Sequence, residues 1–251
     1  MRVIAVINKK GGVSKTTTTA NIGHALALQG HRVTLIDFDP QGHLSVYLGA
    51  REMSGAGVDD VLLGTTDLKT VSIRIRENLT LIQPGKKLDY IEQLLDSRLQ
   101  VSKRLKRSID ELASENDYLL IDCPPSSGLL AIFALYSCHQ VLIPVNGDYL
   151  SLHGVSQFLD TLKSVEKAIG HDIDFQLAMT RYYPRRRLAR SIVKKLLHYF
   201  PGRVLATPVR EASAITEAPG FGKTIFEYAP QSYGSDDYRS LATDLEVGRV
   251  M

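Results

Sequence analysis

The sequence lacks most features that mark secreted, disulfide-bonded or membrane-spanning proteins. Cys123 and Cys138 are the only cysteines among 251 residues, and they form no C-x-x-C pair, so we expect two reduced thiols. Long apolar runs are missing as well. Val3–Ile7 is too short for the core of a signal peptide, and Leu129–Tyr136 is too short to cross a bilayer. We therefore expect a cytoplasmic protein.

Acidic residues are absent from one long stretch. The net charge of the whole chain is only +3, yet residues 175–210 contain no Asp or Glu. The same stretch carries nine basic residues: Arg181, Arg185, Arg186, Arg187, Arg190, Lys194, Lys195, Arg203 and Arg210. This is a local basic field within a nearly balanced protein.

Linkers, internal repeats and low-complexity tracts are also absent, so we expect a single domain over residues 1–251. Short apolar runs alternate with helical patterns, which predicts an α/β fold with a doubly wound, mostly parallel sheet and helices on both faces. Residues 50–78 are the least patterned and are expected to form a surface excursion. The expected strands are Val3–Ile7, Val33–Asp37, Leu79–Gln83, Tyr118–Asp122, Gln140–Val145, Phe175–Thr180 and Val204–Thr207. The expected helices are Thr16–Gln29, Tyr90–Glu115 (as one helix or two), His153–Ile169, Leu188–Phe200 and Asp237–Glu246.

The stretch INKKGGVSKTTTTAN, residues 7–21, resembles a phosphate-binding loop but departs from the pattern G-x-x-x-x-G-K-[ST]. Lys9 and Ser14 stand where that pattern has glycine. Gly11, Gly12, Lys15 and Thr16 remain, and Lys10 is an additional lysine. A strand before the loop and a helix after it would aim main-chain N–H groups and the helix dipole at an anion. Lys15 would then reach the β and γ phosphates, and Thr16 would bind Mg²⁺.

Carboxylates follow two further strand patterns. Asp37 and Asp39 lie in LIDFDPQG, and Asp122 ends the strand of YLLIDCPPSSG. Ligands bind at the carboxyl ends of strands in such sheets. Asp37 would orient groups around the metal, and Asp39 would position or deprotonate an attacking water and contact the metal. Asp122 would hold Mg²⁺ through water, and the loop after it would sense the γ phosphate.

These motifs closely resemble the ParA/MinD family of deviant Walker A ATPases, whose loop reads K-G-G-V-x-K-T-T. The resemblance implies a P-loop fold that binds ATP or ADP with Mg²⁺. It also implies that Lys10 is the signature lysine, which reaches the partner's phosphates in a homodimer formed with ATP. The nucleotide-binding residues would be Lys10, Gly11, Gly12, Val13, Ser14, Lys15, Thr16 and Thr17, with Pro208 and Val209 where relatives hold adenine.

Ser14 departs from the family, in which this position is usually glycine. A positive φ here would cost serine about 1–2 kcal/mol. If the residue is already helical, serine is harmless and can bond a phosphate oxygen. We expect the helical conformation.

The segment RYYPRRRLARSIVKKLLHYFPGR predicts a loop followed by a helix. Its apolar residues Leu188, Ile192, Leu196 and Tyr199 or Phe200 have helical spacing and would face the core. A charge run is usually a solvated face, but relatives use this region for non-specific DNA binding. We expect double-stranded DNA to be bound by Arg185, Arg186, Arg187, Arg190, Lys194 and Lys195.

The resemblance implies a slow, partner-stimulated ATPase that is associated with the nucleoid and positions a cargo through a ParB-like or McdB-like adaptor. The cargo would be a chromosome, a plasmid, a carboxysome or a chemotaxis cluster. The alternative is a MinD-like membrane switch, which the tail SLATDLEVGRVM disfavours because it has little apolar face.

An iron–sulfur ATPase would need cysteines that share a cluster across a dimer, and neither cysteine is placed for that. A non-enzymatic DNA-binding protein with structural ATP is a further alternative. No helix-turn-helix segment precedes Met1, so we do not expect operator-specific repression. His24, His43 and His153 have no metal-binding spacing and are expected to be surface or packing residues.

Overall fold

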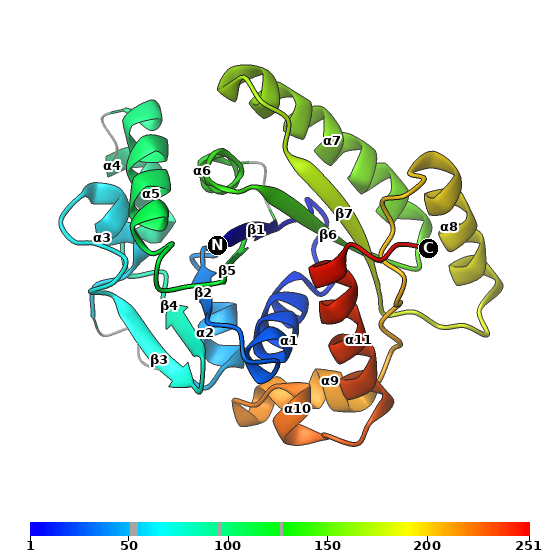
Figure 1. Ribbon diagram of the computed structural model, residues 1–251. Coiled ribbons are helices and arrows are strands. Elements are labelled where there is room, and N and C mark those ends of the chain that lie inside the picture. The colour runs from blue at the N-terminus through cyan, green and yellow to red at the C-terminus, as the bar shows by residue number, and fades with distance from the viewer. Residues whose placement is uncertain (51–54, 95–96, 126–127) are drawn as a thin grey trace.

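The strands form one twisted sheet in the order β3-β4-β2-β5-β1-β6-β7, as Figure 1 shows for the computed structural model. The structure describes residues 1–50, 55–94, 97–125 and 128–251. All the paired strands run parallel except β3, which is antiparallel to β4. The strands are β1 Arg2–Val6, β2 Val33–Asp37, β3 Ser72–Arg76, β4 Leu79–Ile82, β5 Tyr118–Asp122, β6 Gln140–Asn146 and β7 Asp174–Thr180. The predicted α/β class with a mostly parallel sheet is confirmed.

Helices cover both faces of this sheet (Figure 1). One face carries α1 Lys15–Leu28, α2 His43–Tyr47, α10 Ile225–Tyr228 and α11 Tyr233–Val247; the other carries α3 Val58–Leu63, α5 Arg98–Glu111, α6 Leu129–Ser137, α7 Tyr149–Ile169 and α8 Arg187–Tyr199. The short helices α4 Ile91–Leu94 and α9 Ser213–Glu217 complete the set, with 3₁₀ turns at Leu88–Tyr90 and Ala218–Phe221.

Each central strand is apolar on both sides because both of its faces are covered. In β1, Val3 and Ala5 belong to the core under α5, α6 and α7, whereas Ile4 and Val6 belong to the core under α1 and α11. Such a strand appears in the sequence as a continuous apolar run. Because β1, β2 and β5 run parallel, their carboxyl ends lie together at one edge of the sheet, with Asp37 opposite Asp122 in the strand register.

Three expectations about the elements are wrong. Residues 50–78 are more than an excursion, because they include α3 and the edge strand β3. Val204–Thr207 is not a strand: Val204 and Leu205 make only isolated bridges. Pro208 follows, and it has no N–H with which to extend a ladder. The third concerns Leu188 of α8, which is 49% exposed, while Ala189, Ile192 and Leu196 are buried. Of the alternatives Tyr199 and Phe200, Phe200 packs against the core and Tyr199 is 64% exposed.

No helix in the described part of the chain is both long and apolar enough to span a membrane. Of the histidines expected to be surface or packing residues, His24 is buried with its Nδ1 atom 2.6 Å from Thr224 Oγ1, and His43 is exposed. The side chain of His153 lies outside the described residues.

The packing of α8 predicts unequal costs for two similar truncations. Ile192→Ala removes a side chain that is 1% exposed, so we expect it to lower the free energy of unfolding by about 2–4 kcal/mol. Leu188→Ala is the matched control on the same helix and should change stability by less than about 0.5 kcal/mol. Denaturant unfolding of both variants measures the difference. Equal losses would contradict this orientation of α8.

Candidate nucleotide-binding site

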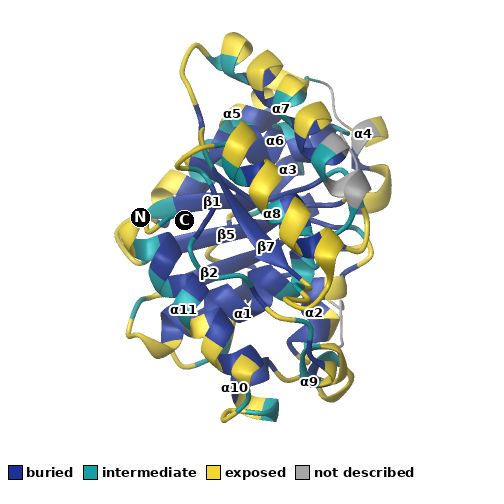
Figure 2. Cartoon of the chain, turned by 90° about the vertical axis from the view of Figure 1, so that its right-hand side faces the viewer, coloured by how far each residue is buried: buried dark blue, intermediate teal, exposed yellow. Residues whose placement is uncertain are grey.

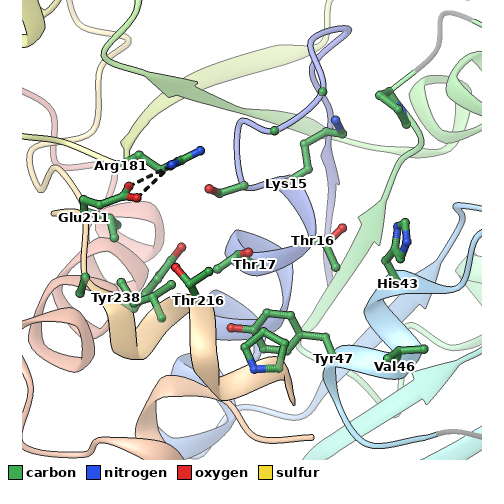
Figure 3. Close-up of a pocket in the computed structure, with 18 of the residues that line it drawn as sticks. Lys15, Thr16, Thr17, His43, Val46, Tyr47, Arg181, Glu211, Thr216 and Tyr238 are labelled. Atoms are coloured by element: carbon green, nitrogen blue, oxygen red, sulfur yellow. Dashed lines mark hydrogen bonds and ion pairs between the residues drawn. The ribbon is translucent and has the colours of Figure 1, made fainter. Parts of the chain in front are cut away.

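A cavity of about 730 Å³ opens at the carboxyl edge of the sheet, above the loop between β1 and α1. Figure 3 shows Lys15, Thr16 and Thr17 on one side of it and Arg181 and Glu211 on another. Further lining residues come from α2, α9, α11 and the segment 209–212, together with Gly11, Gly12, Ser14, Asp39, Gln41, Pro125 and Pro219. The loop predicted from sequence therefore borders a space that is large enough for a nucleotide.

The loop glycines leave room for a ligand. Gly12 has φ +72°, a conformation that L residues adopt rarely, and a Cβ atom on either Gly11 or Gly12 would meet nothing within 4 Å. The side chain of Val13 is buried, so only its main chain can serve the site. Its carbonyl accepts a hydrogen bond of 3.1 Å from Thr180 Oγ1 at the end of β7, which fixes the loop to the sheet.

Ser14 contradicts the expectation that it is helical. It has φ 65° and ψ 34°, in the left-handed region, and its side chain makes no capping bond to α1. The residue still begins the helix, because its carbonyl accepts the N–H of Thr18 at 2.8 Å. Serine therefore carries a backbone cost here that the family's usual glycine avoids.

The two lysines occupy different surroundings. Lys15 lines the cavity, and its Nζ atom donates to the carbonyl of Lys10 at 3.2 Å. Burial lowers the pKa of Lys15, and the nearby Asp122 partly opposes that shift. Lys10 is not among the cavity-lining residues. Its amine forms an ion pair with Asp148 and lies 3.5 Å from Asn146 Oδ1, both at the end of β6.

Asp122 joins α1 to the end of β5. Its Oδ2 atom accepts a bond of 2.7 Å from Thr16 Oγ1, and its Oδ1 atom lies 3.1 Å from Thr19 Oγ1. Burial, and next the charge of Asp37, raise the pKa of Asp122 to about 8. Burial also raises the pKa of Asp37 to about 6, against two bonds that its Oδ2 accepts from Ser45.

This oxygen-rich corner fits a magnesium ion. Within the described residues, Asp37 Oδ1 is buried without a hydrogen-bond partner, and the hydroxyl of Thr16 adjoins the carboxylate of Asp122. Asp39 borders the cavity, and its Oδ1 atom accepts the N–H of Gln41 at 3.0 Å. The described part of the chain has no cluster of three or more His, Cys, Asp or Glu that would enclose a metal. Mg²⁺ needs no such cage, because it takes one or two protein oxygens and completes its shell with phosphate and water.

Of the two residues predicted to contact adenine, one lines the cavity and the other does not. Val209 lines the cavity, with its main chain bonded to Met179 and Tyr182, whereas Pro208 is not among the lining residues. Sequence reasoning missed Val46, Tyr47 and Tyr238, which add to the cavity wall in Figure 3. No local motif marks Val46 or Tyr47. Residues 126 and 127 of the expected γ-phosphate sensing loop lie outside the described residues.

Three of the nine basic residues of 175–210 form ion pairs with acids outside that stretch. Arg181 pairs with Glu211, Arg203 with Asp174 and Arg210 with Asp237, each an acid just outside the stretch or on α11. Glu211, the first acid after the stretch, was a signal that sequence reasoning did not use. The remaining six are exposed residues in or beside α8, whose outer surface faces the viewer in Figure 2; this α8 basic cluster comprises Arg185, Arg186, Arg187, Arg190, Lys194 and Lys195.

A phosphate-binding loop at the end of β1, a helix that begins on it and carboxylates at the ends of β5 and β2 define a P-loop nucleotide-binding protein. Comparisons make the class more specific. A family model described as "AAA domain" matches residues 1–175. The sporulation initiation inhibitor protein Soj of Bacillus subtilis is 36% identical over 97% of this chain and 98% of its own. The chromosome partitioning protein ParA of Caulobacter vibrioides is 32% identical over 98% of this chain and 94% of its own. The chain belongs to the ParA/MinD family of partition ATPases.

Solved structures agree on the fold. A cobyrinic acid a,c-diamide synthase from Mycobacterium smegmatis, with bound ATP analogue and magnesium, superposes with a TM-score of 0.83 at 34% identity, covering 100% of this chain and 98% of that one. An ATP complex of a McdA variant from Cyanothece superposes with a TM-score of 0.86 at 21% identity, covering 100% and 98%. At that lower identity the second likeness concerns the fold alone.

The conformation of Ser14 predicts a stabilising substitution. Ser14→Gly should raise the free energy of unfolding by about 0.5–1 kcal/mol, because removing the left-handed cost outweighs the greater freedom of glycine in the unfolded chain. Ser14→Ala is the control, since it keeps the Cβ atom and should bring no gain. Thermal and denaturant unfolding measure both. A glycine variant no more stable than the alanine variant would contradict the left-handed assignment.

Proposed function

We propose that the protein is a Mg²⁺-dependent ATPase that dimerises with ATP, binds DNA non-specifically in that state and positions a cargo with a partner protein that stimulates hydrolysis. The observation that carries the proposal is the separation of the two lysines. Lys15 faces the cavity of its own chain, while Lys10 is held outside that cavity by Asp148. One lysine serves the chain's own nucleotide, and the other, once it leaves Asp148, acts on the nucleotide of a second copy.

The chain's own residues account for nucleotide binding. Main-chain N–H groups of residues 11–17 and the N-terminus of α1 face the phosphates, and Lys15 exchanges its bond to the Lys10 carbonyl for a phosphate oxygen. Thr16 would hold Mg²⁺, with Asp122 and Asp39 acting partly through water. When bound, the ion would neutralise charge on the β and γ phosphates. Asp39, at the cavity wall, orients the attacking water.

ATP gates the dimer through charge. Two triphosphate sites that approach each other repel, and a lysine delivered from each chain to the other's phosphates offsets that repulsion. Lys10 must leave Asp148 to reach the partner's phosphates, so breaking this ion pair opposes dimerisation. The attraction between Lys10 and the partner's γ phosphate offsets that cost. A ligand shifts such an equilibrium only through its different affinity for the two states.

The α8 basic cluster supplies the DNA-binding surface. Its six exposed cations can meet phosphates, and α8 presents no base-reading geometry of its own, so binding should be sequence-independent and strongly salt-dependent. The helix α8 also contacts the segment Asn146–Asp148, which binds the amine of Lys10. A Cβ atom on Gly147, next to Asp148, would lie 3.1 Å from the Cβ of Ala189 in α8. Movement of the Asn146–Asp148 segment is thereby transmitted to α8.

We expect a nucleoid-associated protein in the cytoplasm, with an adaptor of the ParB or McdB type that links it to a chromosome, plasmid or protein organelle. The relatives named above for sporulation inhibition and chromosome partitioning support this. The MinD-like alternative gains no support from α11. The apolar residues Leu241 and Leu245 are buried in the core that α11 shares with α1.

Two lysine variants test the proposal. Lys15→Ala should abolish ATP binding, because it removes the cation that faces the cavity. Lys10→Ala should bind ATP with nearly unchanged affinity and fail to dimerise. Sedimentation with ATP and with ADP, beside direct nucleotide titration, measures both effects. A normal ATP-dependent dimer of Lys10→Ala would contradict the crossed-lysine proposal.

The DNA surface is tested by charge reversal. Changing Arg185, Arg186 and Arg187 to Glu should abolish binding to random duplex DNA without altering ATP affinity. The matched control reverses three exposed cations of α5, namely Arg98, Lys103 and Arg107, and changes net charge equally. Equal effects of the two sets would mean that DNA responds to net charge rather than to the α8 basic cluster.

The contact between α8 and Gly147 makes a separate prediction. Gly147→Ala forces α8 outward by a few tenths of an ångström. We expect DNA affinity of the ATP form to fall about 2- to 30-fold, the size of a coupling free energy of about 0.5–2 kcal/mol. ATP affinity should stay constant. Ala189→Gly added to this variant removes the clash and should restore DNA binding, and failure of that rescue would exclude the contact as the link.

A further inference from the structure

The chain leaves β1 through a turn built on Asn8. This side chain is fully buried, with 0% exposure. Its Nδ2 atom donates to the carbonyl of Pro144 in β6 at 2.8 Å, and its Oδ1 atom accepts the main-chain N–H of Lys10 at 3.0 Å. The second bond, from residue i+2 back to the side chain of residue i, is an Asx turn.

The side chain of Asn8 makes a hydrogen bond to β6 that the main chain would make if the strand continued, while the main chain itself leaves the sheet. The last main-chain bond from β1 to β6 runs from Ile7 N to Leu142 O at 3.1 Å. In a continuing parallel ladder the next carbonyl, that of Pro144, would accept the N–H of Lys9. The Asn8 amide takes that position instead. The main chain of Lys9 and Lys10 can therefore enter the loop while the buried carbonyl of Pro144 stays hydrogen-bonded.

Lys10 is bounded on several sides as a result. Asn8 holds its main-chain N–H, and Lys15 Nζ donates to its carbonyl. A Cβ atom on Gly154 of α7 would lie 3.8 Å from Lys10 Cβ and 3.5 Å from Asn8 Oδ1, so α7 packs over the start of the lysine side chain. The amine at the far end meets Asp148 and Asn146.

We infer that Asn8 is the positioning residue of Lys10: its Asx turn aims that lysine along the end of β6 rather than into the chain's own phosphate cavity. The inference rests on the proposed function, in which Lys10 acts on the nucleotide of a second copy. Lys15 gives up the carbonyl of Lys10 when it engages phosphate. The Asn8 bonds use neither the amine of Lys15 nor the amine of Lys10, so they keep the main chain of Lys10 in place when these amines engage phosphate.

Substitutions at Asn8 test this role by separating dimerisation from ATP binding. Asn8→Ala removes both bonds, whereas Asn8→Ser keeps a short side-chain oxygen that can accept the N–H of Lys10. For Asn8→Ala we expect ATP-dependent dimerisation to weaken by about tenfold or more, since small misplacements of an acting group are costly. ATP affinity, which depends on Lys15, should change by less than about threefold, well under the 1.4 kcal/mol of a tenfold effect. Asn8→Ser should recover most of the dimer.

Gly154→Val provides a second approach that breaks no hydrogen bond. A Cβ atom at Gly154 makes ordinary contacts with Asn8 and Lys10, so the two γ methyl groups of valine are expected to crowd both residues from the side of α7. The variant should therefore also weaken the dimer while preserving ATP affinity. This variant decides the matter if Asn8→Ala does not fold, which its thermal unfolding curve will show.

Lys10→Ala, measured beside these variants, distinguishes the two proposals. If Lys10→Ala fails to dimerise while Asn8→Ala dimerises like the unmodified protein, the positioning role is wrong and the crossed lysine stands. If Lys10→Ala dimerises normally, the crossed lysine is wrong and the role of Asn8 falls with it. Equal losses of ATP affinity and dimerisation in Asn8→Ala, without recovery in Asn8→Ser, would assign Asn8 a general structural role and overturn the inference.

Discussion

The hydrogen bond between Thr16 and the buried carboxylate of Asp122 connects the parts on which the site depends. It joins the first turn of α1 to the end of β5, 106 residues later in the chain. Because Asp122 lies beside Val6 of β1 and Asp37 of β2 in the strand register, this one contact aligns the loop, the helix and both acidic strand ends. Burial raises the pKa of Asp122 to about 8, so this corner favours a cation or a proton.

Much of this arrangement follows from local sequence. Strands buried on both faces are continuous apolar runs, and β2 and β5 have the bounds that those runs predict. The edge strand β3 escaped prediction although its sequence, SIRIR, alternates as a half-exposed strand does, because the prediction relied on continuous apolar runs. On α8, helical spacing placed Leu188 inward, but the helix turns Ala189 toward Gly147 instead. A small residue is required there by a neighbour that is distant in the sequence, and periodicity cannot reveal such a neighbour.

In the candidate site, too, some features follow from local sequence and others depend on residues that are distant in the chain. Lys15, Thr16 and Asp122 meet because their motifs end adjacent parallel strands, which the topology brings together. Three features needed coordinates: the left-handed Ser14, the pairing of Lys10 with Asp148, and the neutralisation of Arg181, Arg203 and Arg210 by acids outside the basic stretch. The last of these leaves the α8 basic cluster, in or beside a helix that contacts the segment holding Lys10.

The central claim is that ATP controls a DNA-binding surface. The most direct test is the affinity of the unmodified protein for a random-sequence DNA duplex at one moderate salt concentration, with ATP and separately with ADP. The account predicts tight binding with ATP alone. Equal binding in both nucleotide states would leave the basic helix as a DNA-binding surface but contradict its control by the two lysines, and no binding in either state would contradict the DNA-binding role itself.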